Sequence, residues 1–297
     1  MTEFGLGLQS DKSVEEYERI ARRAETAGVD VISVFHDLLY QPAIFPLLVL
    51  ARSTERVRLG PAALNARTLH PVEIAGQVAS LDLASDGRAY LGLVAGSWLD
   101  RLGLEDEQPL TRLREAVEVT RRLLAGDRTG FAGTCFTLTP GAGLEYAPLR
   151  AEMPLLLGTW RPRTAAFAAT VADEVKIGGS ANPDMVRLMR SWLGDDGPRI
   201  VVGAVTVVDE DGDAARVQAE ARVGMYLDVV GRLDPTLELA PGEPPPLDKF
   251  TFAGTPAEVT RQAASLYDAG AARVEFGDPQ GLDLLIDRVL PELGAGG

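Results

Sequence analysis

Residues 153–179 read MPLLLGTWRPRTAAFAATVADEVKIGG. The apolar run Leu155–Leu157 predicts a buried strand. The segment Pro162–Val171 predicts a helix, because it is rich in alanine and proline is favoured in the first turn of a helix. A second strand-like run, Glu174–Ile177, follows directly. A strand, a helix and a strand in so short a segment are typical of a parallel βαβ unit.

The same alternation continues along the chain. Strands are predicted at residues 4–8, 31–35, 57–59, 89–93, 155–157, 174–177, 200–208 and 274–276. Helices are predicted at residues 14–27, 45–54, 71–84, 110–124, 162–171, 183–193, 213–230, 256–269 and 282–290. This pattern predicts an α/β fold, a single (β/α)8 TIM barrel that forms one domain over residues 1–297. The rival is a doubly wound open sheet, but no G-x-G-x-x-G motif lies between the first strand and the first helix.

Two segments interrupt the alternation. Residues 127–148 are rich in glycine and threonine, and they predict an inserted hairpin and loop after the fourth helix. Residues 232–254 are rich in proline and predict a second insertion. A long segment of this kind in an α/β protein is typical of a lid or of a loop that selects the substrate.

Composition narrows the classes of partner. A formal net charge of −14 argues against nucleic acid or an anionic membrane as the main partner. No apolar run approaches the roughly 18 residues that a membrane span needs. The start of the chain has no basic, signal-like segment and Cys135 is the single cysteine, so we expect a cytoplasmic protein. Two histidines and one cysteine predict no metal site of the His/Cys type.

In a barrel the functional residues follow the carboxyl ends of the strands. Two such loops have the form of anion sites, GTWRPRT at residues 158–164 and GGSANPD at residues 178–184. Each joins small residues to a helix start, where free N–H groups and the helix dipole favour a phosphate, and Arg161 and Arg163 add positive charge. The alternative is that both loops are ordinary helix caps.

Two further strand ends carry polar residues. His36-Asp37 follows the second strand, where an imidazole can exchange a proton near neutral pH, although a purely structural histidine is the alternative. The third strand runs into RLGPAALNARTLHP at residues 58–71, which is interrupted by Gly60-Pro61 and turns polar only at Asn65. This distortion predicts a bulge that faces the site. His70, before a helix start, is expected to be structural.

Several stretches in this order resemble the luciferase-like superfamily, in particular its branch that uses the deazaflavin coenzyme F420. The resemblance covers nearly the whole chain and is best over residues 4–210. Its carriers are AETAGVDVISVFHD (24–37), RVRLGPAALNARTLHPVEIAGQVASLDLASDGRAYLGLVAG (56–96), LTRLREAVEVTRRLLAGD (110–127), residues 153–179 and VTVVDEDGDAARVQA (205–219). It implies a (β/α)8 barrel, the fold that the strand count also predicts.

The resemblance also implies roles for residues. In such relatives the third strand bulges, often with a non-prolyl cis peptide, and supports the back of the coenzyme ring. The matching positions are Ala62, Ala63, Leu64 and Asn65. The coenzyme phosphate is implied to bind at Gly158, Thr159, Trp160 and Arg161, with help from Gly178 and Gly179. His36 and Asp37 are the implied catalytic pair, and Ser97 and Trp98 are implied to line the substrate.

Three departures from the family pattern shape the functional hypothesis. The usual Asp-His order is reversed in His36-Asp37, and the glycine-rich loop reads GLVAG at residues 92–96. Ser97-Trp98 stands where some relatives carry a catalytic glutamate, which argues against oxidation of a sugar phosphate. Reduction of a C=C or C=N bond by the reduced coenzyme fits better, with a pterin or a secondary-metabolite intermediate as substrate. The alternatives are an FMN-dependent monooxygenase and a non-catalytic barrel subunit. A homodimer is expected.

Overall fold

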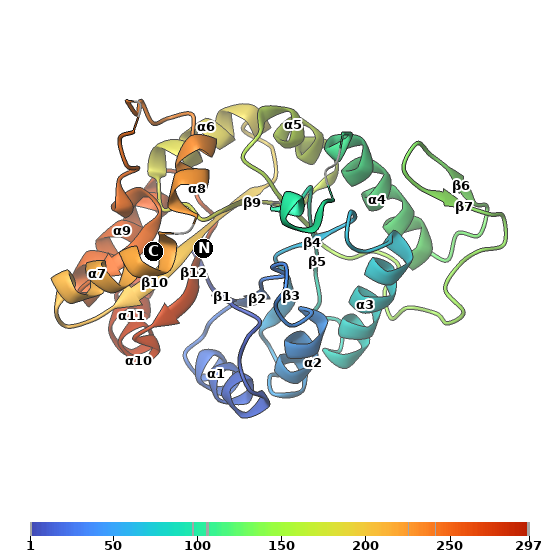
Figure 1. Cartoon of the computed structure of the whole chain (residues 1–297). Helices are drawn as coiled ribbons and strands as arrows, with labels where there is room; N and C mark the ends of the chain where they lie inside the picture. Colours follow the sequence, from blue (N-terminus) through green and yellow to red (C-terminus); the bar gives the residue numbers. More distant parts are fainter. Residues whose placement is uncertain (1, 97, 105–106, 225, 241, 296–297) are drawn as a thin grey trace. The chain divides into compact units, whose positions relative to one another are not determined.

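A computed structural model describes residues 2–96, 98–104, 107–224, 226–240 and 242–295. Figure 1 shows strands that alternate with helices along the chain, which confirms the predicted α/β class. The strands are β1 (Glu3–Leu8), β2 (Val31–Val34), β3 (Arg58–Pro61), β4 (Leu64–Asn65), β5 (Leu91–Val94), β6 (Phe131–Ala132), β7 (Thr137–Leu138), β8 (Leu155–Gly158), β9 (Glu174–Gly178), β10 (Arg199–Val208), β11 (Thr251–Gly254) and β12 (Arg273–Gln280).

Most helices begin where the sequence predicts them. They are α1 (Val14–Thr26), α2 (Ile44–Arg52), α3 (Pro71–Ala84), α4 (Pro109–Leu124), α5 (Pro162–Val171), α6 (Pro183–Leu193), α7 (Gly212–Val223), α8 (Leu227–Leu233), α9 (Pro256–Asp268), α10 (Leu282–Leu284) and α11 (Leu290–Ala295). Short 3-10 turns lie at Leu99–Leu102 and Leu247–Lys249, and a π-helical turn lies at Leu285–Val289. None of the described helices is long and apolar enough to cross a membrane.

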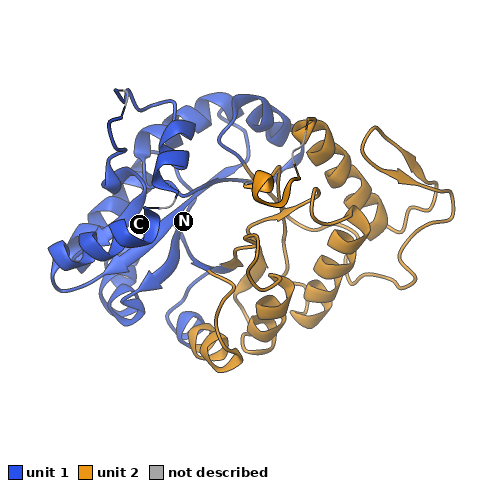
Figure 2. Cartoon of the chain, in the orientation of Figure 1, with its two compact units in different colours: residues 1–8, 23–32, 159–297 blue, residues 9–22, 33–158 orange. Residues whose placement is uncertain are grey.

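The chain forms two compact units, each made of separate segments (Figure 2). Unit 1 comprises residues 1–8, 23–32 and 159–297, and unit 2 comprises residues 9–22 and 33–158. The expectation of a single domain stays a prediction.

The strands of unit 1 are parallel. β10 pairs with β9 on one side and with β12 on the other, and β12 pairs with β1. β11 lies alongside the carboxyl-terminal half of β10, from Val205 to Val208. Helix α7 packs on these two strands through small residues, because Ala215 and Ala219 form one buried cluster with Val207 and Ala253.

The strands of unit 2 are parallel as well, apart from one hairpin. β5 pairs with β4 and with β8, and a bridge joins Leu59 in β3 to Ala89 just before β5. β6 and β7 form an antiparallel hairpin within residues 127–148, so the first predicted insertion is confirmed (Figure 1). Glu115 of α4 accepts hydrogen bonds from the N–H groups of Thr134, Cys135 and Phe136 and so holds the hairpin turn.

One predicted element was wrong. The helix predicted at residues 213–230 is two helices, since α7 ends at Val223 and α8 begins at Leu227. Gly224 follows α7 directly, and glycine costs about 1 kcal/mol in a helix interior. The predicted insertion at residues 232–254 ends in a strand that was not predicted, since Thr251–Gly254 forms β11. The apolar stretch of β11 is short, and the prolines that precede it are typical of a loop, so the sequence did not indicate a strand there. Helix α9 begins with a capping box, in which Thr255 and Glu258 exchange hydrogen bonds.

Candidate active site

The third strand is interrupted at the position that the sequence indicates. β3 ends at Pro61 and β4 begins at Leu64, and the peptide bond between Ala62 and Ala63 is cis. The N–H of Ala62 donates a hydrogen bond to the carbonyl of Val34, 2.8 Å away. Below the break, the buried Tyr90 hydroxyl donates to the carbonyl of Gly60 at 3.0 Å. The break is therefore an ordered bulge.

Asn65 ends the bulge and is buried. Its Oδ1 accepts hydrogen bonds from the N–H groups of Arg67 and Thr68, at 3.2 and 3.0 Å, and from the Thr68 hydroxyl at 3.1 Å. This is an Asx-turn, in which the side chain replaces a backbone acceptor. Because Oδ1 already accepts these hydrogen bonds, the Nδ2 atom of Asn65 is the one that can donate to a ligand.

His36 follows β2 and is half-buried, whereas Asp37 beside it is exposed. The Nδ1 atom of His36 accepts a hydrogen bond from the N–H of Ala43 at 3.3 Å. Burial lowers the pKa of His36. The imidazole is therefore neutral near pH 7, with its proton on Nε2, and it acts as a hydrogen-bond donor at that atom.

We expect His36 to make the protein less stable as the pH falls below its ordinary pKa of 6.5. In that range the unfolded chain has already taken up a proton at this residue, while the folded chain resists it until a lower pH. The stability contribution is therefore complete above pH 6.5 and is lost as the pH falls through the folded pKa. His36→Asn keeps an acceptor for Ala43 and does not titrate, so denaturant melts of this variant should depend less on pH.

His70 supplies the control for that measurement. Its Nδ1 caps α3 by accepting from the N–H of Val72, which confirms that it has a structural contact. Asparagine is also a good N-cap, so His70→Asn should keep the cap of α3 and report the effect of a histidine-to-asparagine change outside the site. If His36→Asn retains the full pH dependence, burial of His36 is not its cause.

The loop after β5 carries the predicted substrate-lining pair. Trp98 is 40% exposed and has a positive φ of 52°. A tryptophan in this conformation is held there by its surroundings. Ser97 lies outside the described residues. Gly96, also at positive φ, leaves room for Leu99, because a Cβ there would lie 3.0 Å from Leu99 Cδ1.

The loop that follows Gly158, the last residue of β8, is held against β9. The N–H of Thr159 donates to the carbonyl of Lys176 at 3.0 Å, and the indole of Trp160 donates to the carbonyl of Gly178 at 3.0 Å. The N–H of Arg161 donates to the Thr159 hydroxyl at 3.0 Å. These bonds orient the loop toward the N-terminus of α5.

The two predicted anion loops differ in how their helices begin. Helix α5 has no side-chain cap, and Arg161 and Arg163 at its start are exposed. Helix α6 is capped, because the Asn182 side chain accepts from the N–H of Asp184 at 3.1 Å. An uncapped start leaves N–H donors for an anion. Of the two helices, α5 is therefore the one whose start carries no side-chain cap.

Asn182 joins the second loop to the proline-rich segment. Its amide donates to Asp234 Oδ2 and to the Thr236 hydroxyl, each at 2.9 Å, and its Oδ1 also accepts from Lys249 Nζ at 3.0 Å. Asn182 and Asp234 are both buried. These bonds anchor Asp234, Thr236 and Lys249 to the loop that also carries Gly178 and Gly179.

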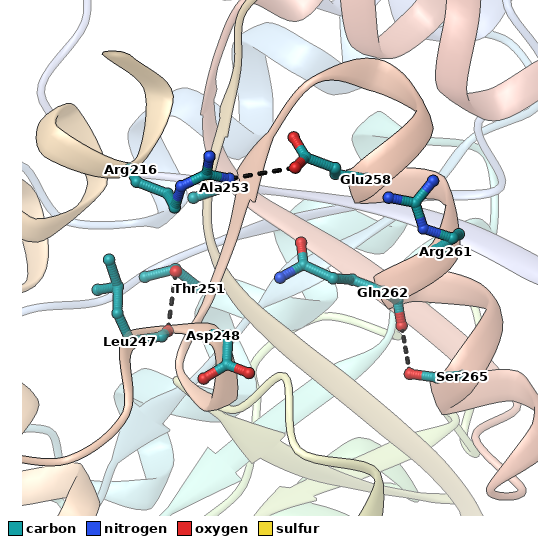
Figure 3. A pocket seen from close by; sticks show the side chains of 9 residues that line it. All are labelled: Arg216, Leu247, Asp248, Thr251, Ala253, Glu258, Arg261, Gln262 and Ser265. Atoms are coloured by element: carbon teal, nitrogen blue, oxygen red, sulfur yellow. Dashed lines mark hydrogen bonds and ion pairs between the residues drawn. The ribbon is translucent and has the colours of Figure 1, made fainter. Parts of the chain in front are cut away.

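A pocket of about 400 Å³ lies elsewhere in unit 1, between α7, β11 and α9 (Figure 3). It is lined by Arg216, Leu247, Asp248, Thr251, Ala253, Glu258, Arg261, Gln262 and Ser265. Arg216 is paired with Glu258 at 3.3 Å across one side of this pocket. None of the individual residues assigned from the sequence to coenzyme or substrate lines it, although Leu247, Asp248, Thr251 and Ala253 belong to the proline-rich segment 232–254. We assign it no part in the site.

Reasoning from the sequence missed one group of side chains. Glu174 and Lys176 of β9 form ion pairs with Arg273 and Glu275 of β12, inside what were read as apolar strands. The signal is present in EVKIG and RVEFG, where charged residues occupy alternate positions and therefore share one face of a strand. Among the described residues, no group of histidine, cysteine, aspartate and glutamate could hold a metal ion.

Comparison with known proteins supports the resemblance. Residues 1–273 match the luciferase-like monooxygenase family. A 5,10-methylenetetrahydromethanopterin reductase of Archaeoglobus fulgidus is 28% identical, over 98% of this chain and 99% of its own. A putative coenzyme F420-dependent oxidoreductase of Mycobacterium tuberculosis is 27% identical, over 76% of this chain and 72% of its own.

A solved structure shows the same fold. The coenzyme F420-dependent tetrahydromethanopterin reductase of Methanopyrus kandleri superposes with a TM-score of 0.81, at 20% identity, over 98% of this chain and 99% of its own. This likeness is one of fold, and it confirms the predicted (β/α)8 class.

Proposed function

Because the chain belongs to the luciferase-like monooxygenase family, we propose that it is an oxidoreductase that uses the deazaflavin coenzyme F420. The observation that carries the proposal is the uncapped start of α5 beside Arg161 and Arg163. N–H donors, a helix dipole and two guanidinium groups fit the phosphate of a coenzyme. The preference for F420 over FMN comes from the relatives described above.

The chain's own residues fit the parts of this coenzyme. We assign the phosphate to Gly158, Thr159, Trp160 and Arg161, with Gly178 and Gly179 as neighbours on the adjoining loop. We assign the back of the ring to Ala62, Ala63, Leu64 and Asn65 of the bulge. The small side chains of the two alanines let the backbone approach a flat ring. The Oδ1 atom of Asn65 already accepts hydrogen bonds, so its Nδ2 atom is the one that can donate to a polar edge of the ring.

The reaction that we propose is reduction of a C=C or C=N bond in a small molecule, such as a pterin or a secondary-metabolite intermediate. When bound in its reduced form, the coenzyme supplies the hydride from C5 of its ring. His36, neutral and protonated at Nε2, orients a polar group near the reacting atoms, with Asp37 beside it. Trp98 lines the substrate, and its indole excludes water from one side.

FMN-dependent oxygenation is the second candidate, because the matched family is described as monooxygenases. The phosphate loop suits either coenzyme. The protein also stays a predicted homodimer and a predicted cytoplasmic enzyme.

A parallel titration of the purified protein with coenzyme F420 and with FMN tests the proposal. The readout is the change in coenzyme fluorescence. We expect saturable binding of F420 at micromolar concentrations or below, and much weaker binding of FMN. A preference for FMN would replace the reductase with the monooxygenase, and binding of neither coenzyme would overturn both.

A further inference from the structure

The pocket between α7, β11 and α9 lies wholly within unit 1 (Figure 3). Its volume of about 400 Å³ falls within the range of roughly 300–1,000 Å³ that is usual for a small-molecule site. None of the individual residues assigned to coenzyme or substrate lines it. A ligand bound here would therefore occupy a second site, and the charges and hydrogen bonds of the lining indicate which ligand fits.

The positive charge of Arg216, on the α7 side of the pocket, is already neutralised. Its Nη2 atom lies 2.6 Å from Asp213 Oδ1, and its Nη1 atom lies 3.3 Å from Glu258 Oε1. Glu258 also accepts hydrogen bonds from the N–H and the hydroxyl of Thr255. Figure 3 shows the pair of Arg216 and Glu258 along one side of the pocket. With two carboxylates beside it, Arg216 has no charge to spare for an anionic ligand.

The hydroxyl groups of the lining are bonded within the wall of the pocket. The Thr251 hydroxyl donates to the carbonyl of Leu247 at 2.9 Å. The Ser265 hydroxyl donates to the carbonyl of Gln262 at 2.7 Å. Both bonds can be followed in Figure 3. A hydroxyl has only one proton, so in this arrangement neither group donates to a ligand.

Two donor groups on α9 remain for a ligand. Arg261 is exposed, and among the residues that the structure describes its guanidinium has no ion pair or hydrogen bond. The side-chain amide of Gln262 makes no hydrogen bond within the described part of the chain either, although its Oε1 atom is closed off from solvent. A buried amide oxygen without a partner is unfavourable, so the protein alone does not satisfy this side chain. Figure 3 shows the Gln262 amide directed into the pocket, where its Nε2 atom can donate.

These donors fit a ligand with a single negative charge. A guanidinium binds a carboxylate through two parallel N–H bonds, and Arg261 is the one guanidinium of the lining that is not neutralised. The Asp248 carboxylate lies on the side of the pocket away from Glu258 (Figure 3), where it would repel a doubly charged phosphate. Leu247 and Ala253 offer apolar surface to a short carbon chain. A small organic monocarboxylate meets all of these conditions.

One short turn joins the pocket to the loop 178–184. Leu247 and Asp248 line the pocket, and Lys249 is the third residue of the same 3-10 turn. The carbonyl of Lys249 accepts a hydrogen bond from the N–H of Ala181 at 2.8 Å, and its Nζ atom donates to Asn182 Oδ1 at 3.0 Å. A ligand that holds the first two residues of the turn therefore also restrains the third. That residue is bonded to the loop assigned as a neighbour of the coenzyme phosphate.

We infer that this pocket binds a small organic monocarboxylate through Arg261 and Gln262, and that its occupancy strengthens coenzyme binding through Lys249. The site itself is independent of the proposed function, whereas its effect on the coenzyme rests on that function. The coupling acts because a turn that is already ordered costs less to hold in place when the coenzyme binds. Since coupling between two binding sites is reciprocal, the coenzyme strengthens binding of the carboxylate by the same factor.

Isothermal titration calorimetry of the full protein with hexanoate tests the site. We expect saturable binding that is about tenfold weaker, or lost, in Arg261→Gln and in Gln262→Glu, which keeps the shape of the side chain but adds a negative charge. Arg288→Gln removes an exposed arginine elsewhere in unit 1, where it pairs with Glu210 at 3.5 Å, and should bind as the wild type does.

Three results would overturn the site: no saturable binding, full binding by both pocket variants, or equal binding of the uncharged hexan-1-ol. Stronger binding of inorganic phosphate than of hexanoate would overturn the choice of a monocarboxylate. Thermal melts of each variant establish that it is folded.

Fluorescence titration with coenzyme F420, with and without saturating hexanoate, tests the coupling. We expect the affinity for F420 to be about fivefold higher with hexanoate, the lower end of allosteric couplings. Lys249→Met should abolish this gain while calorimetry still detects hexanoate, and Arg261→Gln should show no gain. A gain that persists in Arg261→Gln, or hexanoate binding that leaves the affinity for F420 unchanged, overturns the coupling. Absence of F420 binding overturns the proposed function, and the calorimetric result then decides the site by itself.

Discussion

Replacing Gly92 with alanine is expected to lower the free energy of unfolding by about 3 kcal/mol, the upper end of the cost of overpacking. A Cβ at this position would lie 1.9 Å from the carbonyl oxygen of Pro61. The oxygen belongs to the backbone of β3, which cannot turn aside as the end of a flexible side chain can. Either β5 or the bulge after β3 has to move, and denaturant melts followed by tryptophan fluorescence measure the cost.

Gly76 offers a matched control in the same unit. It lies inside α3, and the nearest atom to a new Cβ would be the Tyr146 hydroxyl at 3.9 Å. Gly76→Ala should therefore stabilise the protein by about 0.8–1.0 kcal/mol, the difference between alanine and glycine in a helix. Equal destabilisation by both substitutions would contradict the argument from close approach at Gly92.

The same substitution tests the bulge in ligand binding. If Ala62 to Asn65 support the coenzyme ring, Gly92→Ala should also weaken F420 binding in the fraction of protein that remains folded. If the variant is destabilised but binds F420 with wild-type affinity, the shape of the bulge does not contribute to coenzyme binding.

Helix starts were predictable because their signals are local. Pro71, Pro162, Pro183 and Pro256 each open a helix at the residue that the sequence indicates. Proline fixes φ near the helical value and lacks the N–H that a first turn leaves unpaired. A reader of the sequence needs no knowledge of the rest of the fold to place such a start.

Contacts between distant segments were not predictable in this way. In the sequence, capping was only one of two interpretations of the loop that holds Asn182. Its bonds to Asp234, Thr236 and Lys249 join residues that lie 52 to 67 positions away. Lys176 and Glu275 are separated by 99 positions. Each is an isolated charge until the strand register is known, and β9 and β12 meet only through β10.

The distinction between the two anion loops also required the structure. In the sequence, Arg161-Pro162 and Asn182-Pro183 are both plausible helix starts. In the fold, Asn182 uses its side chain to cap α6 and to hold the proline-rich segment, whereas α5 is left without a side-chain cap. Whether a helix start can bind an anion therefore depends on whether a side chain already accepts hydrogen bonds from its first N–H groups.

The double variant Arg161→Ala/Arg163→Ala is expected to weaken F420 binding by about tenfold to a hundredfold. A hydrogen bond to a charged group contributes about 1.5–3 kcal/mol, and every 1.4 kcal/mol is a factor of ten in affinity. Both arginines are exposed at the start of α5, so their removal should not lower the stability of the fold. Fluorescence titration measures the change, and the salt dependence of binding should decrease with it.

Two controls make this result specific to the phosphate. Arg187→Ala removes an exposed arginine from α6, where it pairs with Asp184 at 2.8 Å, and should leave the affinity unchanged. The ring-and-ribityl fragment of the coenzyme lacks the phosphate, so its weaker binding should be the same for wild type and double variant. If the double variant loses affinity for the fragment to the same degree, the arginines contact the ring or shape the loop, and the assignment of the phosphate to α5 is wrong.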